Sequence, residues 1–318
     1  MPRTDFQDGS LTANEGFSDG EDHKMKFKHT TGEKIFDVFL YIFLGLLAVL
    51  FIYPFWTVIA MSFNSATDTM RGGIILWPRE FTLNNYRAVF KDNSIFQAYF
   101  ITIARTVIGT IGHLLFTSAL AYGLSKKHLM FRKTYFNLCI ITMFFSGGMI
   151  PGVLNIFRLG LGNSFLVYVV PGLYSVYDMI IIKSFFNAMP QSLEESAKID
   201  GANDLVIFFR IVLPNAKAVL ATIGLATAVG QWNAWFDAYL YVDNPDLWPV
   251  QLLLQRVIAS ATSMSDAVAQ NPNITAGSIS PYSVQLATII VAIGPIILIY
   301  PFFQKYFVKG MMIGAIKE

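Results

Sequence analysis

The sequence predicts an all-α integral membrane protein with six transmembrane helices. Its 318 residues are 54% apolar and only 14% charged, whereas about a quarter of the residues are charged in a typical soluble domain. The mean hydropathy is +0.50, and apolar runs of membrane-spanning length recur along the chain. Because a helix needs about 20 apolar residues to cross the hydrocarbon core, these runs are best explained as spans.

The chain is expected to begin with a disordered tail and a basic collar over residues 1–34. The first part of this segment is rich in Gly, Ser, Asp and Glu, and lysines follow just before the first apolar run. Residues 35–318 are expected to form the membrane domain, with predicted spans at 35–63, 96–124, 135–150, 165–186, 219–242 and 284–307. The third span is the shortest, and its outer end is poorly defined because it runs into Gly147, Gly148 and Pro151.

The distribution of basic residues predicts the orientation. The short connection 125–133 carries four Lys or Arg, which places it in the cytoplasm. The connection between the fifth and sixth spans has Arg256 against three aspartates and is expected outside. Both termini are then cytoplasmic. The mixed charges of the 64–94 loop argue weakly the other way.

A polar island at 190–214 separates the fourth and fifth predicted spans, on the cytoplasmic side. Ser192 and Glu195 have the spacing of a capping box, so a short helix is expected to begin at Ser192. It should stop near Gly201, because glycine adopts the left-handed turn that ends helices. A second short helix is expected to start with Asn203 as its cap and to end before Pro214, which lacks an amide proton.

Polar residues within the predicted spans are candidates for a translocation path, since such groups usually face a bundle interior or water. Asp178, flanked by Tyr174 and Tyr177, is the most suggestive. It could equally form a structural pair with Lys183. On the second span, Arg105 is expected near the outer surface with its charged end reaching toward water, and His113 is a weaker candidate.

The end of the fifth span interleaves polar and aromatic side chains. Gln231, Asn233 and Asp237 alternate with aromatic residues that include Trp235. Rings beside amide and carboxylate groups suit a sugar, whose apolar faces stack while its hydroxyls form hydrogen bonds. The same pattern is typical of an interfacial aromatic belt, and the sequence leaves both interpretations open.

Several chemistries have no sequence support. The chain contains no G-x-x-x-x-G-K-[ST] phosphate loop, no H-E-x-x-H motif and no nucleophile elbow. Cys139 is the only cysteine, and the four histidines lack metal-ligand spacing. We therefore expect no catalytic residues, no metal and no cofactor bound by this chain.

The island resembles the cytoplasmic "EAA" loop of ABC-importer permeases. Glu195-Ser-Ala197, Gly201 and Ile211-x-Leu213-Pro214 match the spacing of that motif, and 194–202 looks like the carbohydrate-uptake, maltose-importer-type branch. The stretches 119–125, 159–163 and 300–310 are also similar to the family, the last to its oligosaccharide-importing subgroup. Ser196 and Ala218 depart from the usual pattern.

This resemblance implies a type I importer permease in a bacterial cell membrane. The loop would be the coupling helix that docks on a cytoplasmic ATPase, through Glu194, Glu195, Ser196, Ala197, Asp200, Gly201 and Ala202. Two ATPase subunits would carry the ATP and magnesium. The other implied partners are a sister permease, an extracellular solute-binding protein, an oligosaccharide and the lipid bilayer, with no nucleic acid.

Two other classes remain as alternatives. A self-contained, ion-coupled transporter should show repeated broken helices and charged sites in both halves, and no convincing repeat is present. An intramembrane enzyme would need a nucleophile and a base, for which the sequence offers no candidate set.

Overall fold

The structure is a computed structural model that describes residues 30–270, except 75 and 92, together with 282–295 and 297. These residues form helices and connecting segments, and their only β-type pairing is an isolated bridge between Asn64 and Phe81. The chain divides into two compact units, residues 1–53 and residues 54–318. Most of the predicted tail lies outside the described residues.

The first unit is described from residue 30, and it contains most of helix α1 (Thr31–Ser62). Thr30 and Glu33 form a capping box, because the Thr30 amide donates to Glu33 Oε2 at 2.7 Å and the Glu33 amide donates to Thr30 Oγ1 at 3.4 Å. The apolar side chains of α1 are exposed around the whole helix. A helix that is apolar on every side is a span or a buried element, so lipid or another subunit is needed to cover it.

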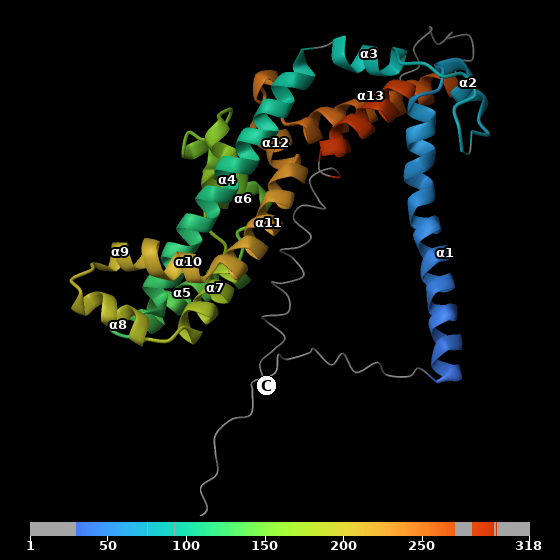
Figure 1. Ribbon diagram of the computed structural model, residues 1–318. Helices are drawn as coiled ribbons and strands as arrows, with labels where there is room; N and C mark the ends of the chain where they lie inside the picture. Colours follow the sequence, from blue (N-terminus) through green and yellow to red (C-terminus); the bar gives the residue numbers. More distant parts are fainter. Residues whose placement is uncertain (1–29, 75, 92, 271–281, 296, 298–318) are drawn as a thin grey trace, which may run out of the picture. The chain divides into compact units, whose positions relative to one another are not determined.

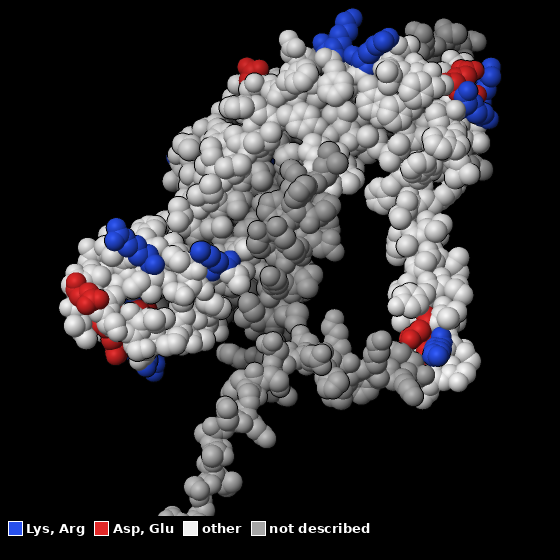
Figure 2. All heavy atoms as spheres, viewed as in Figure 1, with Lys and Arg blue, Asp and Glu red and all other residues white. Residues whose placement is uncertain are grey.

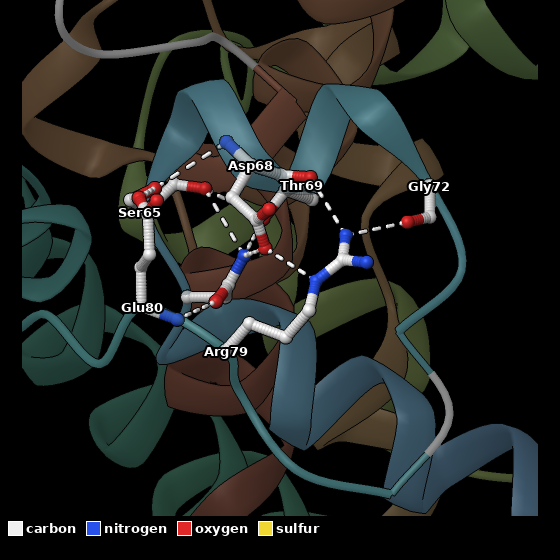
Figure 3. A network of polar contacts seen from close by, with 7 residues as sticks. Ser65, Asp68, Thr69, Gly72, Arg79 and Glu80 are labelled. Carbon is white, nitrogen blue, oxygen red and sulfur yellow. Dashed lines mark hydrogen bonds and ion pairs between the residues drawn. The ribbon is translucent and has the colours of Figure 1, made fainter.

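The second unit opens with a polar network that follows the end of α1 (Figure 3). Asn64 is completely buried. Its side-chain amide donates to Asp68 Oδ2 at 2.9 Å and to Thr69 Oγ1 at 3.0 Å, and its carbonyl accepts from the Glu80 amide at 2.8 Å. These bonds tie helix α2 (Ala66–Arg71) to the returning chain before helix α3 (Asn84–Lys91).

Arg79, in the segment that returns from α2 to α3, completes this network. Its Nε donates to Asp68 Oδ2 at 2.9 Å, and Nη2 donates to the Gly72 carbonyl at 2.6 Å. The hydrogen bond from Asn64, followed by that from Arg79, lowers the pKa of Asp68 below its ordinary value of 3.8. The loop of mixed charge is therefore a folded element.

Helix α4 (Ser94–Ser125) is the central element of the second unit (Figure 1). It packs most extensively against α11 (Lys217–Asn233) and α7 (Val176–Ala188). Toward its C-terminal end, Ala121 and Tyr122 join a core with Met179 and Ile182 of α7. Toward its N-terminal end, Ile101 joins a separate core of apolar residues. Both cores therefore share α4.

The third predicted span is wrong as a continuous helix. Helix α5 (Arg132–Phe144) ends before the predicted span does, and α6 (Met149–Arg158) leaves it at an angle of 118°. The cause is the glycine pair that precedes α6. Gly148 has a φ of 87°, a conformation that glycine adopts without steric cost.

The fourth and fifth predicted spans are also interrupted. The fourth consists of two 3₁₀ turns, η1 (Phe165–Tyr168) and η2 (Val170–Gly172), followed by α7 at a bend of 48°. Pro171 explains this break, because it cannot donate a backbone hydrogen bond. The fifth consists of α11 and a short helix α12 (Phe236–Tyr241), joined at Ala234 and Trp235.

The described chain ends with helices that pack back on α4. After the turn η4 (Pro245–Leu247), helix α13 (Val250–Gln270) begins with the Val250 amide donating to Thr102 Oγ1 at 2.9 Å. An apolar helix follows at Tyr282–Pro295. The sixth predicted span continues to 307, and most of its remainder lies outside the described residues.

The described residues contain two helices that could each cross a membrane, α1 and α4, and up to five spans if each bent pair counts as one. On the face of the second unit that Figure 2 shows, charged side chains gather at its two ends, around α8 (Ser192–Ile199), α9 (Asp204–Ile207) and α10 (Leu213–Asn215) and around α2 and α3. The described surface that is visible between these ends is almost free of them. This distribution fits a band surrounded by lipid.

Candidate functional site

The polar island folds into two short helices joined by a tight turn, as the sequence predicts. The first is α8 (Ser192–Ile199), with Asp200 as its C-cap. Gly201 has a φ of 80°, and its amide donates to the Lys198 carbonyl at 3.0 Å. The Ala202 amide donates to the Ala197 carbonyl at 2.9 Å. These two bonds define a Schellman motif, which requires the left-handed residue at Gly201.

The predicted capping box at Ser192 and Glu195 is wrong. The N-cap is Gln191, which has no side-chain cap bond, and Ser192 is the first residue of the helix. Gln191 already has helical angles, with φ −63° and ψ −27°. Ser192 therefore lies inside the first turn of α8, one residue past the N-cap position.

The second short helix begins as predicted and ends later than predicted. Asn203 caps α9 (Asp204–Ile207) by accepting from the Val206 amide at 2.9 Å. The helix then continues through a π-helical turn, η3 (Phe208–Val212), and through α10 (Leu213–Asn215), which contains Pro214. In a π turn each carbonyl accepts from the amide five residues ahead instead of four. The helix can therefore continue although Pro214 has no backbone amide proton to donate.

The inner face of this helix pair is anchored to the ends of α4 and α7. Ala197 is buried, and Ile207, Phe208 and Val212 join the core that contains Tyr122. Lys126, in the loop after α4, forms an ion pair with Glu194, and its Nζ lies 3.8 Å from the centre of the Tyr122 ring. A movement of α8 therefore reaches α4 and α7 through direct contacts.

The outer face of the helix pair is apolar and exposed. Ile199 is 86% exposed and Leu205 is 69% exposed, and Leu193 and Phe209 are also exposed. Among the predicted coupling residues, Glu195, Ser196, Asp200 and Gly201 lie on the surface, whereas Glu194, Ala197 and Ala202 face the body of the unit. An apolar surface of this kind marks an interaction site.

A buried ion pair joins α4 to the end of the fifth predicted span. Arg105 is only 1% exposed. Its guanidinium donates to Asp237 Oδ2 at 2.5 Å, to Gln231 Oε1 at 3.1 Å and to the Ala234 carbonyl at 3.2 Å. The same group lies 4.3 Å from the ring centre of Tyr168. The predicted outer-surface position of Arg105 is therefore wrong, because Asp237 and Gln231 provide partners in the interior.

A second polar pair lies two turns further along α4. His113 Nε2 is 3.0 Å from Asp178 Oδ2, and Nδ1 is 2.7 Å from the Gly172 carbonyl oxygen. A carbonyl only accepts, so Nδ1 carries a proton, and the contact with Asp178 needs a second proton on one of its two members. The structural pair considered for Asp178 and Lys183 is wrong. The Lys183 Nζ instead lies over the Phe136 ring at 3.7 Å.

Both polar pairs belong to one face of α4. Arg105, Gly109 and His113 are spaced by four residues, so they lie above one another on the helix. A Cβ added to Gly109 would lie 3.0 Å from the Gln231 amide nitrogen, so Gly109 admits Gln231 between the pairs. This polar stripe, extended by Thr102 and Thr117, is the signal that sequence reasoning missed.

The structure does not bring the other predicted path residues into these pairs. Tyr174 and Tyr177 are exposed, and the Asn233 side chain donates to the Val229 carbonyl of its own helix at 2.9 Å. Trp235 packs edge-on against Phe236. Of the seven predicted path residues, Asp178, Gln231 and Asp237 are therefore half-buried partners of the buried Arg105 and His113.

These features define a class of protein. The described part of the chain combines broken apolar spans, buried polar pairs at the breaks and an apolar-faced helix pair at one end, as expected for a transport subunit that docks on another protein. The chain belongs to the family described as the inner membrane component of binding-protein-dependent transport systems, whose model matches residues 134–313.

Individual relatives agree with this assignment. Protein LplC of Bacillus subtilis (strain 168) is 40% identical over 290 residues, which cover 91% of this chain and 97% of LplC. The polygalacturonan/rhamnogalacturonan transport system permease protein YtcP of the same strain is 40% identical over 285 residues, covering 89% of this chain and 99% of YtcP.

A solved structure agrees as well. A chain of a bacterial ABC transporter involved in the import of the acidic polysaccharide alginate has a TM-score of 0.78 and 31% identity, covering 89% of this chain and 100% of that one. The protein is therefore a membrane-embedded permease subunit of an ABC transport system, with the type I importer fold, and it is not an enzyme. Its family implies an ATPase and a substrate-binding protein as partners.

Proposed function

We propose that this chain is the permease subunit of an ABC importer for a polysaccharide-derived oligosaccharide, and that α8 and α9 couple it to the ATPase. The exposed apolar face of Ile199, Leu205 and Phe209 carries the proposal. Burying three such side chains contributes about 1.5–3 kcal/mol each relative to leaving them in water. A groove on an ATPase subunit supplies the apolar surface that this helix pair needs.

The anchoring of the inner face explains how motion is transmitted. The ion pair of Lys126 with Glu194 and the buried Ala197 hold α8 against the ends of α4 and α7. An ATPase that closes on bound ATP pulls α8, and α8 carries α4 and α7 with it. The spans then alternate between the two access states. ATP and magnesium belong to the ATPase subunits in this proposal.

The breaks beside α4 are the proposed location of the translocation path. Asp178 and Asp237 are both partly exposed in the second unit, with side chains 23% and 29% accessible. Carboxylates that remain accessible beside broken spans provide acceptors for sugar hydroxyls. The substrate class is supported by relatives named for polygalacturonan/rhamnogalacturonan and for arabinooligosaccharides.

The first helix supports a proposal for the assembly. Among the described residues of the first unit, none covers the apolar side chains of α1, which supports pairing with a sister permease in the bilayer. The four basic residues of the 125–133 loop support a cytoplasmic position for α8 and for both termini, and an extracellular binding protein would deliver the sugar from the other side.

Reconstitution tests the proposal directly. The chain, its sister permease, the ATPase and the binding protein are assembled in liposomes, and ATP hydrolysis is measured with and without the loaded binding protein. We expect stimulation that Ile199→Asp abolishes while the subunits remain in the membrane. Ser192→Ala, on the exposed first turn of α8, is the matched control. Undiminished stimulation in Ile199→Asp would contradict the coupling role.

A further inference from the structure

A second feature of the cytoplasmic end is a hollow beside α5 that neither the coupling loop nor the polar pairs use. Its volume is about 540 Å³. It lies between the loop after α4, the first turns of α5 and one face of α7. We call it the basic groove, and its lining consists of Lys127, Leu129, Phe131, Arg132, Lys133, Phe136 and Lys183.

The charge of the basic groove has one sign. Four of its seven lining residues are Lys or Arg, and none of the described lining residues is acidic. The adjoining hollow of about 420 Å³ differs, because Glu194 and Glu195 line it together with lysines. No ion pair of the described residues neutralises the cations of the basic groove.

Contacts with the protein hold two of these cations, Lys183 and Arg132, in place. The Lys183 Nζ lies 3.7 Å from the centre of the Phe136 ring, and Arg132 Nε donates to the Leu124 carbonyl at 2.8 Å. Arg132 retains its other guanidinium protons for a further acceptor. A pre-positioned cluster of cations without a carboxylate fits a phosphate, which accepts several charge-assisted hydrogen bonds at once.

The surroundings of the groove identify the source of that phosphate. Met130 and Phe131 are exposed between the basic residues, and Phe131 is held in the left-handed region with a φ of 57°. Three of the seven lining residues, Leu129, Phe131 and Phe136, are apolar. A basic site of headgroup size with apolar side chains in its own lining matches a phospholipid.

We infer that the basic groove binds an anionic phospholipid of the cytoplasmic leaflet. Lys127, Arg132, Lys133 and Lys183 contact the phosphate, and the apolar lining residues Leu129, Phe131 and Phe136 contact the first part of an acyl chain. The inference does not depend on the coupling role of α8. It depends only on the groove lying at the cytoplasmic membrane boundary, as the basic loop predicts.

Lipid titration of the whole complex tests the inference. The complex is stripped of lipid in detergent and titrated with phosphatidylglycerol or with phosphatidylcholine of the same chains, and bound lipids are counted by native mass spectrometry. We expect a preference for phosphatidylglycerol that the double variant Lys133→Gln/Lys183→Gln weakens about tenfold or more, since each basic residue contributes about 1 kcal/mol near an anionic surface.

Matched variants separate the groove from net charge. Lys91→Gln/Lys217→Gln removes the same charge from surfaces that do not line the groove, and it should keep the preference. Lys133→Arg/Lys183→Arg should also keep it, which excludes a folding defect at these positions. Equal loss in the two glutamine variants, or equal binding of both lipids, would overturn the inference.

Two further arms exclude other occupants. Soluble glycerol phosphate at millimolar concentration should not displace the lipid, and displacement would assign the site to a free phosphate. The complex and the permease pair without its ATPase subunits should bind the lipid equally. If the lipid binds only when the ATPase subunits are absent, acidic side chains of the ATPase are the occupant and the inference fails.

Discussion

The turn at Gly201 offers the sharpest perturbation of the proposed coupling element. Its φ is +80°, and an added Cβ would meet no atom within 4 Å. Substitutions there therefore act through the backbone alone, without a steric clash. The left-handed conformation costs an L-residue about 1–2 kcal/mol, with Asn tolerating it better than most. Proline cannot adopt it, because its ring fixes φ near −65°.

These costs predict an order of activity. A penalty of about 1–2 kcal/mol lowers the population of the native turn by a factor of about 5–30 relative to competing turns. Stimulated ATP hydrolysis should therefore decrease from wild type and Gly201→Asn to Gly201→Ala. Gly201→Pro should abolish it, since that variant also loses the hydrogen bond from the Gly201 amide to the Lys198 carbonyl.

The assay is ATP hydrolysis by the reconstituted complex, stimulated by the loaded binding protein, with membrane insertion measured in the same samples. The amount of protein inserted in the membrane should be equal for wild type and the three Gly201 variants, because the turn lies outside the predicted spans. Equal stimulation in Gly201→Pro and wild type would refute the reasoning. So would equal, strong losses in Gly201→Asn and Gly201→Pro, because the left-handed conformation would then not be the determining factor.

Three other predictions concern charged groups. Arg105→Leu should lower the free energy of unfolding of the purified protein by about 1–3 kcal/mol, because the half-buried Asp237 loses its charged partner. Adding Asp237→Leu should restore part of this loss in thermal denaturation, and no recovery would argue against the pair. His113→Leu should slow sugar uptake in proteoliposomes more than Asp178→Asn, which keeps a polar partner for the ring, and the reverse order would contradict the geometry. The pKa of Asp68 is lowered in the folded protein, so the ionised carboxylate stabilises the 64–85 loop fully above the ordinary pKa of 3.8, and this stabilisation disappears as pH falls through the lower folded pKa. Asp68→Asn should therefore weaken the loop at pH 7 and match wild type in acid, as measured by Trp77 fluorescence.

Short-range chemistry explains what the sequence predicted about the coupling loop. The end of α8 at Gly201 and the start of α9 at Asn203 depend on residues within a few positions, so both predictions are confirmed. The capping box failed because it depended on where the helix starts, and Gln191 had already adopted helical angles. When the start of α8 shifts by one residue, Ser192 moves from the N-cap position into the first turn.

Long-range pairing explains what the sequence missed in the membrane. Arg105 looked like a surface residue because its partners, Asp237 and Gln231, lie more than a hundred residues away. The sequence marked only the end of the third span, through Gly147, Gly148 and Pro151, and the breaks of the fourth and fifth spans were not predicted. Their consequence was not visible either, because the carbonyls freed at Gly172 and Ala234 are satisfied by side chains from α4. Hydropathy measures length and polarity along the chain, and it carries no information on which span faces which.

Site-specific photo-crosslinking tests the contact between α8 and the ATPase. A photoreactive amino acid is placed at Ile199, which is 86% exposed on α8, and at Trp77, which is 72% exposed in the loop between α2 and α3. We expect that Ile199 crosslinks to the ATPase subunit, that the yield changes with ATP, and that Trp77 does not crosslink to it. Absence of an ATPase adduct at Ile199 in an assembled, active complex would contradict the proposal that α8 is the coupling helix.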